Sequence, residues 1–295
     1  MPALHIATST TESVEIWNEW EQDLKSRYPP PHTQDNQSTD CTVTEFRGLD
    51  GQWIRRSTLL ALLATSTPLH QEKRAKYHSL ELGKYGIWEM LEKLNTLVDE
   101  SDPDTSLSQI QHALQCAEAA RRDEKPDWFI LTTLIHDLGK ILFFEGESQH
   151  LVVGDTFPLG LPFSDKIVYA KYFSENPDSK NSEYQQSPFG IYSPGIGLDS
   201  VIMSFGHDDY LAKVCERYLP KEALACIKYH SFYSWHRDGA YRDLMNADDE
   251  MKLKAVQEFN PYDLYTKHDV EVDVEQVKPY YLDLIAKFFP GKIDW

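Results

Sequence analysis

The stretch Leu131–Lys140 constrains the fold and the chemistry of this chain more than any other feature. It places His136 and Asp137 side by side inside a segment that is otherwise apolar. An ionised carboxylate is costly to bury unless something pairs with it. A metal ion satisfies the carboxylate and uses the neighbouring imidazole as a second ligand. The segment therefore predicts a metal site inside a helical core.

Further metal-ligand residue types stand on both sides of this pair. His112 precedes it, and His207, His230 and Asp263 follow it. Four histidines and two aspartates are more than one catalytic metal ion normally takes from a protein. The sequence therefore predicts two metal ions that share one site.

Each of the flanking residues also has an ordinary explanation when it is taken alone. His112 fits a hydrogen-bonded core histidine, and His207 fits a solvated helix start. His230 fits a helix end, where it would stabilise the dipole. The Asn260–Pro261 pair predicts a helix N-terminus with Asn260 as the N-cap, so that Asp263 would lie in the first turn. These explanations do not account for the order of the residues on separate predicted helices.

Helix-compatible runs cover most of the chain beyond residue 46. The Trp128–Phe144 run is apolar almost all round, which is typical of a central helix wrapped by others. A short strand is expected within Leu151–Gly160, and Ser174–Gly197 is expected to be a long functional loop. The sequence thus predicts an all-α fold with a minor short β element. The expected helices are Ser57–Ala64, Leu80–Leu97, Leu107–Ala120, Trp128–Phe144, Ser200–Tyr218 and Lys221–Ser231.

Composition narrows the class of protein. Residues 1–42 are polar and contain a proline run, so we expect a mobile N-terminal extension, followed by a single catalytic domain over 43–295. No secretory signal or membrane-spanning run is visible in the sequence. The four cysteines have no paired spacing, so we expect reduced thiols and a cytoplasmic protein. The formal net charge of −18 argues against nucleic acid and anionic membranes as partners.

With these residues in view, the chain resembles the HD-domain superfamily and, within it, the myo-inositol oxygenase family. The resemblance covers Phe46–Trp295. It is weakest in the N-terminal extension and over Thr105–Gln111. The matching blocks are Asp99–Asp104, Asp127–Phe129, Ile135–Lys140, Val152–Pro158, Gly197–Asp199, Met203–Asp208, His230–Tyr233, Trp235–His236, Glu258–Asn260, Asp263–Lys267, Pro279–Tyr281 and Pro290–Trp295.

The resemblance implies an HD-domain-like helical bundle that holds a mixed-valent Fe(II)/Fe(III) pair. It implies that Asp137 bridges the two irons. The first iron would be held by His112, His136, Asp137 and Asp263, and the second by His207, His230 and Asp137. Imidazole and carboxylate ligands suit iron and leave positions open for substrate and O₂.

The resemblance also implies the reaction and its participants. The expected activity is the four-electron, O₂-dependent ring cleavage of myo-inositol to D-glucuronate, with Lys140 as the catalytic residue. The polar side chains that the resemblance assigns to substrate binding also fit surface charges, turns or caps when each is taken alone. For Arg47, a surface salt bridge remains an equal alternative. The implied substrate-binding residues are Arg47, Asp99, Asp102, Lys140, Gly154, Asp155, His230, Ser231 and Lys267.

Two other functions use the same residues. A metal-dependent phosphohydrolase of the HD superfamily would activate water at phosphorus, although the chain shows no Gly-rich phosphate loop and no arginine cluster near the metal segments. A non-catalytic metal-binding scaffold would have no use for polar groups such as Lys140 and Asp155 beside open metal positions. We expect the aromatic residues Phe232, Tyr233 and Trp235 to pack in the core, and the protein to be a monomer.

Overall fold

The computed structural model describes residues 45–47, 53–55, 66–97, 108–168, 170–264 and 271–295. Within these ranges the chain is mainly helical, which confirms the predicted all-α class. The described β structure consists of two short antiparallel pairs. β1 (Glu45–Arg47) pairs with β2 (Trp53–Arg55), and β3 (Lys84–Tyr85) pairs with β4 (Ile293–Asp294).

Helices of very different length make up the described body. The α-helices are α3 (Thr67–Tyr77), α4 (Ile87–Leu94), α5 (Gln109–Arg122), α6 (Asp127–Ile135), α7 (Gln149–Val152), α8 (Ser182–Gln185), α9 (His207–Cys215), α10 (Lys221–Tyr229), α11 (Tyr233–His236), α12 (Ala247–Leu264) and α13 (Val274–Ala286). The 3₁₀ helices are η1 (Leu138–Glu145), η2 (Ala170–Glu175), η3 (Pro177–Lys180), η4 (Leu198–Ser200) and η5 (Arg242–Leu244).

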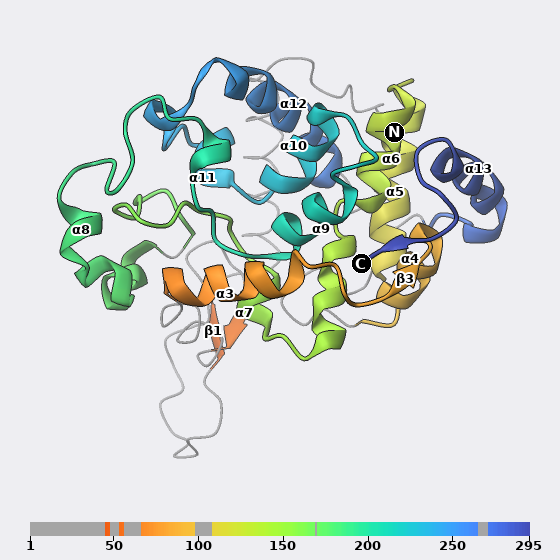
Figure 1. The fold of residues 1–295 in the computed structure, drawn as a ribbon. Helices are drawn as coiled ribbons and strands as arrows, with labels where there is room; N and C mark the ends of the chain where they lie inside the picture. The colour runs from red at the N-terminus through yellow and green to blue at the C-terminus, as the bar shows by residue number, and fades with distance from the viewer. Residues whose placement is uncertain (1–44, 48–52, 56–65, 98–107, 169, 265–270) are drawn as a thin grey trace, which may run out of the picture.

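The core lies where α5, α6, α9, α10 and α12 meet (Figure 1). α6 packs on α5, α10 packs on both α9 and α12, and η1 packs on α9. Every residue of α6 from Phe129 to Ile135 is buried, as predicted for a central helix. Its two threonines are accommodated because the Thr132 hydroxyl donates to Trp128 O and the Thr133 hydroxyl donates to Ile130 O.

The predicted Trp128–Phe144 helix is in fact two elements. α6 ends at Ile135, and the chain continues after Asp137 as the 3₁₀ helix η1. Asp137 itself has φ −91° and ψ −2°, which lies at the edge of helical geometry. The change of helix type therefore falls at the His136–Asp137 pair.

The predicted helix start at Asn260 is wrong. α12 runs from Ala247 to Leu264 with Pro261 inside it, and Asn260 is buried within the helix. The capping contact belongs to Asn246, whose Oδ1 accepts from Asp248 N at 3.0 Å. Asp263 consequently lies in the last turn of a long helix rather than in the first turn of a new one.

Other expected boundaries also change. α3 was not expected, and the helix expected from Leu80 begins at Ile87, since Leu80 has a φ of 55°. The expected strand within Leu151–Gly160 is only an isolated bridge between Pro158 and Met203. The Ser200–Tyr218 and Lys221–Ser231 predictions contain the shorter helices α9 and α10, and the Ser174–Gly197 loop contains η3 and α8. The expected helix at Ser57–Ala64 lies outside the described residues.

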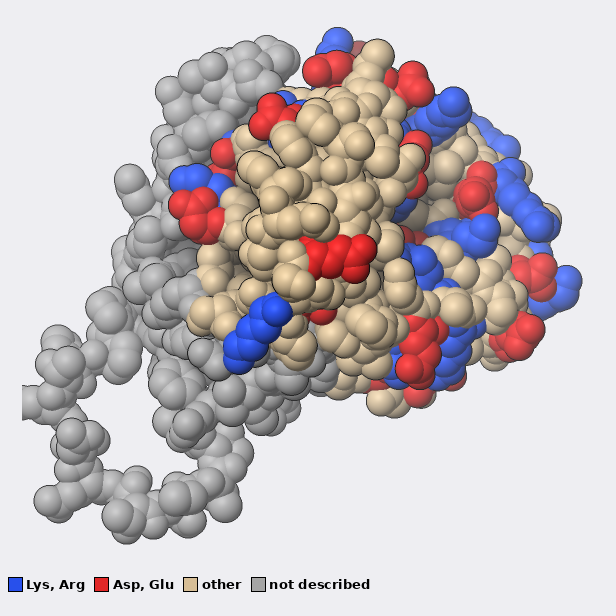
Figure 2. Space-filling view, turned by 60° about the vertical axis from the view of Figure 1, so that its left-hand side comes forward, with Lys and Arg blue, Asp and Glu red and all other residues tan. Residues whose placement is uncertain are grey.

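The surface view in Figure 2 shows acidic and basic side chains intermixed along one side, and mainly uncharged side chains across the centre. Among the described residues, no helix combines the length and apolar character needed to cross a membrane.

Trp295 closes one end of the core, beside α4 and β3. Its side chain is fully buried, and its Nε1 donates to Tyr85 O at 3.1 Å. We expect Trp295→Ala to lower the free energy of unfolding by about 3–5 kcal/mol, because it leaves a large cavity. Leu282→Ala on α13 is the control, since Leu282 is 42% exposed and should change stability by less than about 0.5 kcal/mol. Denaturant unfolding measures both, and equal stability of the two variants would contradict the packing described.

Candidate metal centre

The six residues predicted as metal ligands come together in the core, although they come from five separate parts of the chain. His112 lies on α5, and Asp263 lies in the last turn of α12. His136 and His230 cap the ends of α6 and α10, and His207 begins α9. Asp137 comes directly before η1. His136, Asp137, His207 and His230 are buried, and the other two side chains are mostly buried.

Asp137 lies between two pairs of imidazoles. Its Oδ2 is 3.4 Å from His112 Nε2 and 3.6 Å from His136 Nε2. Its Oδ1 is 3.3 Å from His207 Nε2 and 3.9 Å from His230 Nε2. The two oxygens of one carboxylate thus face two different pairs, which is the arrangement a bridging ligand needs.

Asp263 completes only one of the two pairs. Its Oδ1 is 3.4 Å from His112 Nε2 and 3.2 Å from His136 Nε2. The site is therefore asymmetric: one half has two imidazoles and a carboxylate of its own, and the other half has two imidazoles. Both halves share Asp137.

Backbone carbonyls orient three of the imidazoles. The Nδ1 atoms of His136, His207 and His230 bond to Thr133 O, Val152 O and Ile227 O, at 3.0, 2.7 and 2.8 Å. In its neutral form, each ring therefore carries its proton on Nδ1 and directs the Nε2 lone pair toward the centre.

This orientation leaves two lone pairs facing each other. His207 Nε2 and His230 Nε2 are 3.1 Å apart, and a ring with its single proton on Nδ1 has none on Nε2 to donate. Two nitrogens bound to one ion at about 2.0–2.1 Å are separated by about 3.0–3.4 Å. The spacing and the donor types therefore fit a shared metal cation.

The charges of the cluster also favour a bound metal cation. Burial opposes ionisation of Asp137, but Lys140 and His136 hold the pKa of its carboxyl well below the ordinary value. Burial also opposes a charge on His136, but Asp137 and Asp263 overcome it and raise the pKa of His136 to about 9. Burial, together with the neighbouring His207 and His136, lowers the pKa of His230 to about 3. The carboxylates are ionised at neutral pH, and they attract positive charge to the centre.

Gly139, two residues after Asp137, allows η1 to approach α9 closely. A Cβ at this position would overlap the carbonyl group of His207. We expect Gly139→Ala to move His207 out of the cluster, to lower the melting temperature and to reduce the bound metal, with a stability loss of about 1–3 kcal/mol.

Gly291→Ala is the matched control for this substitution, because nothing lies within 4 Å of the added carbon there. Thermal unfolding and metal analysis of both variants provide the measurement. Wild-type stability and metal content in Gly139→Ala would show that η1 and α9 are not held this closely.

Two predicted substrate-binding residues, Lys140 and Ser231, lie next to ligand candidates of this centre, and the local structure of two more, Asp155 and Gly154, is described. Lys140 Nζ is 3.0 Å from Asp137 Oδ2, and the Lys140 side chain is only 13% exposed. Ser231 is buried directly after His230. Asp155 Oδ2 accepts from Val168 N at 2.8 Å, and the preceding Gly154 has a φ of 119°, which favours glycine.

The other predicted substrate residues lie wholly or partly outside the described part of the chain. Asp99, Asp102 and Lys267 lie outside the described residues, and only the backbone of Arg47, in β1, is described. They remain predictions from the sequence.

Two residues at the centre were not predicted to be there. Tyr233 was expected in the core with Phe232 and Trp235. Those two are fully buried, whereas Tyr233 is partly exposed. Burial and then the charges of Asp263, Asp155 and Asp137 hold the pKa of Tyr233 well above its ordinary value, so its hydroxyl stays protonated. In the sequence, the sign that Tyr233 lies near the metal centre was its position three residues after His230.

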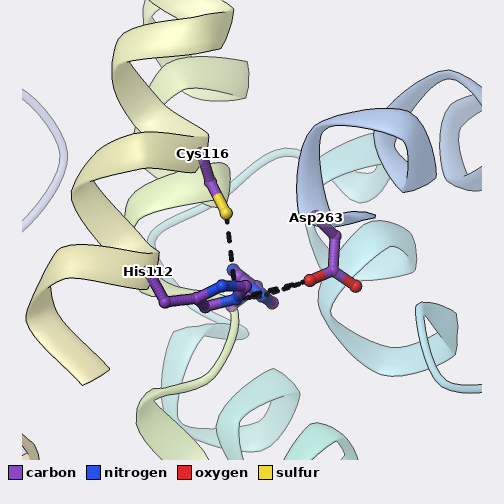
Figure 3. Close-up of side chains that lie close together, drawn as sticks. His112, Cys116 and Asp263 are labelled. Atoms are coloured by element: carbon purple, nitrogen blue, oxygen red, sulfur yellow. Dashed lines mark hydrogen bonds and ion pairs between the residues drawn. The ribbon is translucent and has the colours of Figure 1, made fainter. Parts of the chain in front are cut away.

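Cys116 is the second unexpected neighbour. It lies one turn after His112 on α5, and its sulfur points toward the His112 ring, which Asp263 approaches from a different direction (Figure 3). The signal in the sequence was the i, i+4 spacing from His112.

An all-α bundle with four imidazoles and two carboxylates around one buried centre is typical of the class of helical proteins that bind metal ions. Comparison with known proteins then identifies the family. A sequence model described as myo-inositol oxygenase matches residues 64–295. The chain belongs to the myo-inositol oxygenase family. This confirms the resemblance found in the sequence and the expectation of an oxygenase enzyme.

Relatives from distant organisms agree with this assignment. An inositol oxygenase of Dictyostelium discoideum is 49% identical over 234 residues, covering 76% of this chain and 80% of that protein. Inositol oxygenase 1 of Arabidopsis thaliana is 45% identical over 284 residues, covering 92% and 89% of the two chains. An inositol oxygenase of Mus musculus is 45% identical over 228 residues, covering 76% and 80%.

Proposed function

We propose that this chain uses O₂ to cleave the ring of myo-inositol to D-glucuronate at a site that holds two irons. Family membership supports the reaction. The observation that carries the two-metal site is the division of Asp137, whose Oδ2 faces His112 and His136 while its Oδ1 faces His207 and His230.

The ligands divide between the two irons along the same line. His112, His136, Asp263 and Asp137 would hold the first iron, and His207, His230 and Asp137 the second. Nitrogen and carboxylate donors suit iron, and the second half has fewer protein donors, which leaves room for other ligands. When bound, a mixed-valent iron pair supplies the redox chemistry that a four-electron oxidation by O₂ requires.

The side chains around the centre have separate tasks in this proposal. Lys140 keeps a buried positive charge beside Asp137, and that charge eases the loss of a proton from a substrate hydroxyl. Ser231 and Asp155 provide a hydroxyl and a carboxylate, which suit a neutral polyol better than a charged pocket would. The backbone N–H of Val168 orients Asp155.

Water is kept from the centre by apolar side chains on the same segment. Ile135, Leu138, Ile141 and Leu142 flank the His136–Asp137 pair along the chain and are all buried. This shell lowers the local dielectric constant, so the Lys140 charge acts more strongly on nearby groups.

We also propose that residues 43–295 form one HD-domain-like catalytic domain, and that the chain acts as a cytoplasmic monomer. The family match over 64–295 supports the extent of the domain. The proposed extension over 1–42 and the cytoplasmic location rest on composition, and the monomeric state stays a prediction.

Substrate tests separate this function from its main rival. Iron-loaded protein incubated in air with myo-inositol should form glucuronate. The same protein should release no inorganic phosphate from a panel of nucleotides and phosphonates. Phosphate release with myo-inositol unchanged would favour the metal-dependent phosphohydrolase. If neither glucuronate nor phosphate forms, the result would favour the non-catalytic scaffold.

A further inference from the structure

Cys116 adds a sulfur donor to one half of the metal centre. Its side chain is fully buried, and its Sγ lies 3.8 Å from His112 Nε2. Ligand atoms of Cys116, His112, His136 and Asp263 all lie within 4.8 Å of one another. Figure 3 shows the sulfur and the Asp263 carboxylate approaching the His112 ring from different directions.

Four of the six separations among these donors fit the edges of a tetrahedron around a small cation, and the other two, both from the sulfur, are at most 4.8 Å. Zn²⁺ binds nitrogen and oxygen at about 2.0–2.2 Å and sulfur at about 2.3 Å, so the edges of its tetrahedron measure about 3.3–3.8 Å. His112 Nε2 lies 3.4 Å from His136 Nε2, 3.4 Å from Asp263 Oδ1 and 3.8 Å from Cys116 Sγ. His136 Nε2 lies 3.2 Å from Asp263 Oδ1.

We propose that Cys116, His112, His136 and Asp263 form a tetrahedral site for a thiophilic divalent cation such as Zn²⁺ or Cd²⁺. The thiol loses its proton to solvent when the cation binds. Three of the four donors are those proposed for the first iron, so the two metals exclude each other. Thiolate favours softer ions, and Zn²⁺ generally binds such sites more tightly than Fe²⁺.

The other described cysteines do not share this environment. Cys215 and Cys226 are buried, and burial raises the pKa of both thiols. Cys226 Sγ donates to Ala255 O at 3.4 Å, and neither cysteine belongs to a described cluster of metal-ligand residues. Cys215 is therefore a matched control: it is a buried thiol that should not reach a metal.

Co²⁺ reports directly on sulfur ligation, because a Co²⁺–thiolate bond gives an intense near-ultraviolet charge-transfer absorption. Metal-free full-length protein titrated with Co²⁺ should develop this absorption at about one equivalent. Cys116→Ser and Cys116→Ala should lose it, and Cys215→Ser should keep it. Circular dichroism confirms that each variant is folded.

A competition titration with a chelator gives the second readout. Loss of a metal ligand should weaken Zn²⁺ binding by more than the ~10–100-fold typical of residues that only support a ligand. X-ray absorption of Zn²⁺-loaded wild-type protein should show sulfur at about 2.3 Å, and this measurement does not depend on any variant folding. Zn²⁺ bound without sulfur, or a Co²⁺ absorption that persists without Cys116, would overturn the proposal. None of these readouts requires myo-inositol or turnover.

Discussion

His207→Ala is expected to lower bound iron from about two per chain to about one and to abolish ring cleavage. His207 Nε2 is 3.1 Å from His230 Nε2 and 3.3 Å from Asp137 Oδ1, so its removal leaves the second iron with a single imidazole and a shared carboxylate. The first iron keeps all of its donors. The loss of affinity at the second position should exceed the ~10–100-fold typical of a supporting residue.

His78→Ala is the matched control for this variant. His78 is a histidine outside the cluster, and its Nε2 pairs with Asp209 at 2.9 Å. It should bind about two irons and turn over normally. Iron analysis, circular dichroism and turnover decide the outcome. Two irons in a folded His207→Ala protein would mean that His207 is not a ligand and that the assignment of the second iron is wrong.

Lys140→Ala is expected to keep its fold and its iron but to lose about 10²- to 10⁴-fold in turnover, the range typical of a residue that assists proton transfer. The Lys140 ammonium is mostly buried and lies 3.0 Å from Asp137 Oδ2. Its loss removes the positive charge that eases deprotonation of the substrate, while the charge of Asp137 is still balanced by bound iron.

Lys287→Ala tests whether the effect is specific. Lys287 also pairs with an aspartate, Asp127, at 2.7 Å, but both side chains are about half exposed. Exposed pairs contribute about 0–1 kcal/mol, so turnover should not change. Near-normal turnover of iron-loaded Lys140→Ala would show that Lys140 only balances the charge of Asp137.

The central part of the fold could be predicted because its signals are local. The all-round apolar character of α6 indicated a buried helix, and α5 and α10 begin within two residues of their expected starts. α3 was missed because it buries Thr67, His70 and Tyr77 rather than an aliphatic stripe. The Asn260–Pro261 pair misled because the tertiary packing of α12 outweighs the local preference of these residues for a helix start.

The candidate site could likewise be predicted only in part from the sequence. The order of the histidines and aspartates, together with the family resemblance, was enough to nominate six ligands that the structure brings to one centre. The sequence could not show how Asp137 divides its oxygens, or that Gly139 lies against the His207 carbonyl. Both depend on the packing of η1 on α9. The proximity of Cys116 and Tyr233 likewise appears only once α5 and α11 are placed in space.

The most direct test of the account follows O₂ and product together. Iron-loaded protein is incubated with myo-inositol in a sealed vessel, with no external reductant present during turnover, while dissolved O₂ and D-glucuronate are recorded. Ring cleavage of the hexol to glucuronate removes four electrons and is balanced by one O₂, with one oxygen atom leaving as water. We expect one glucuronate to form for each O₂ consumed. Product formation without O₂ uptake, or O₂ uptake without glucuronate, would contradict it.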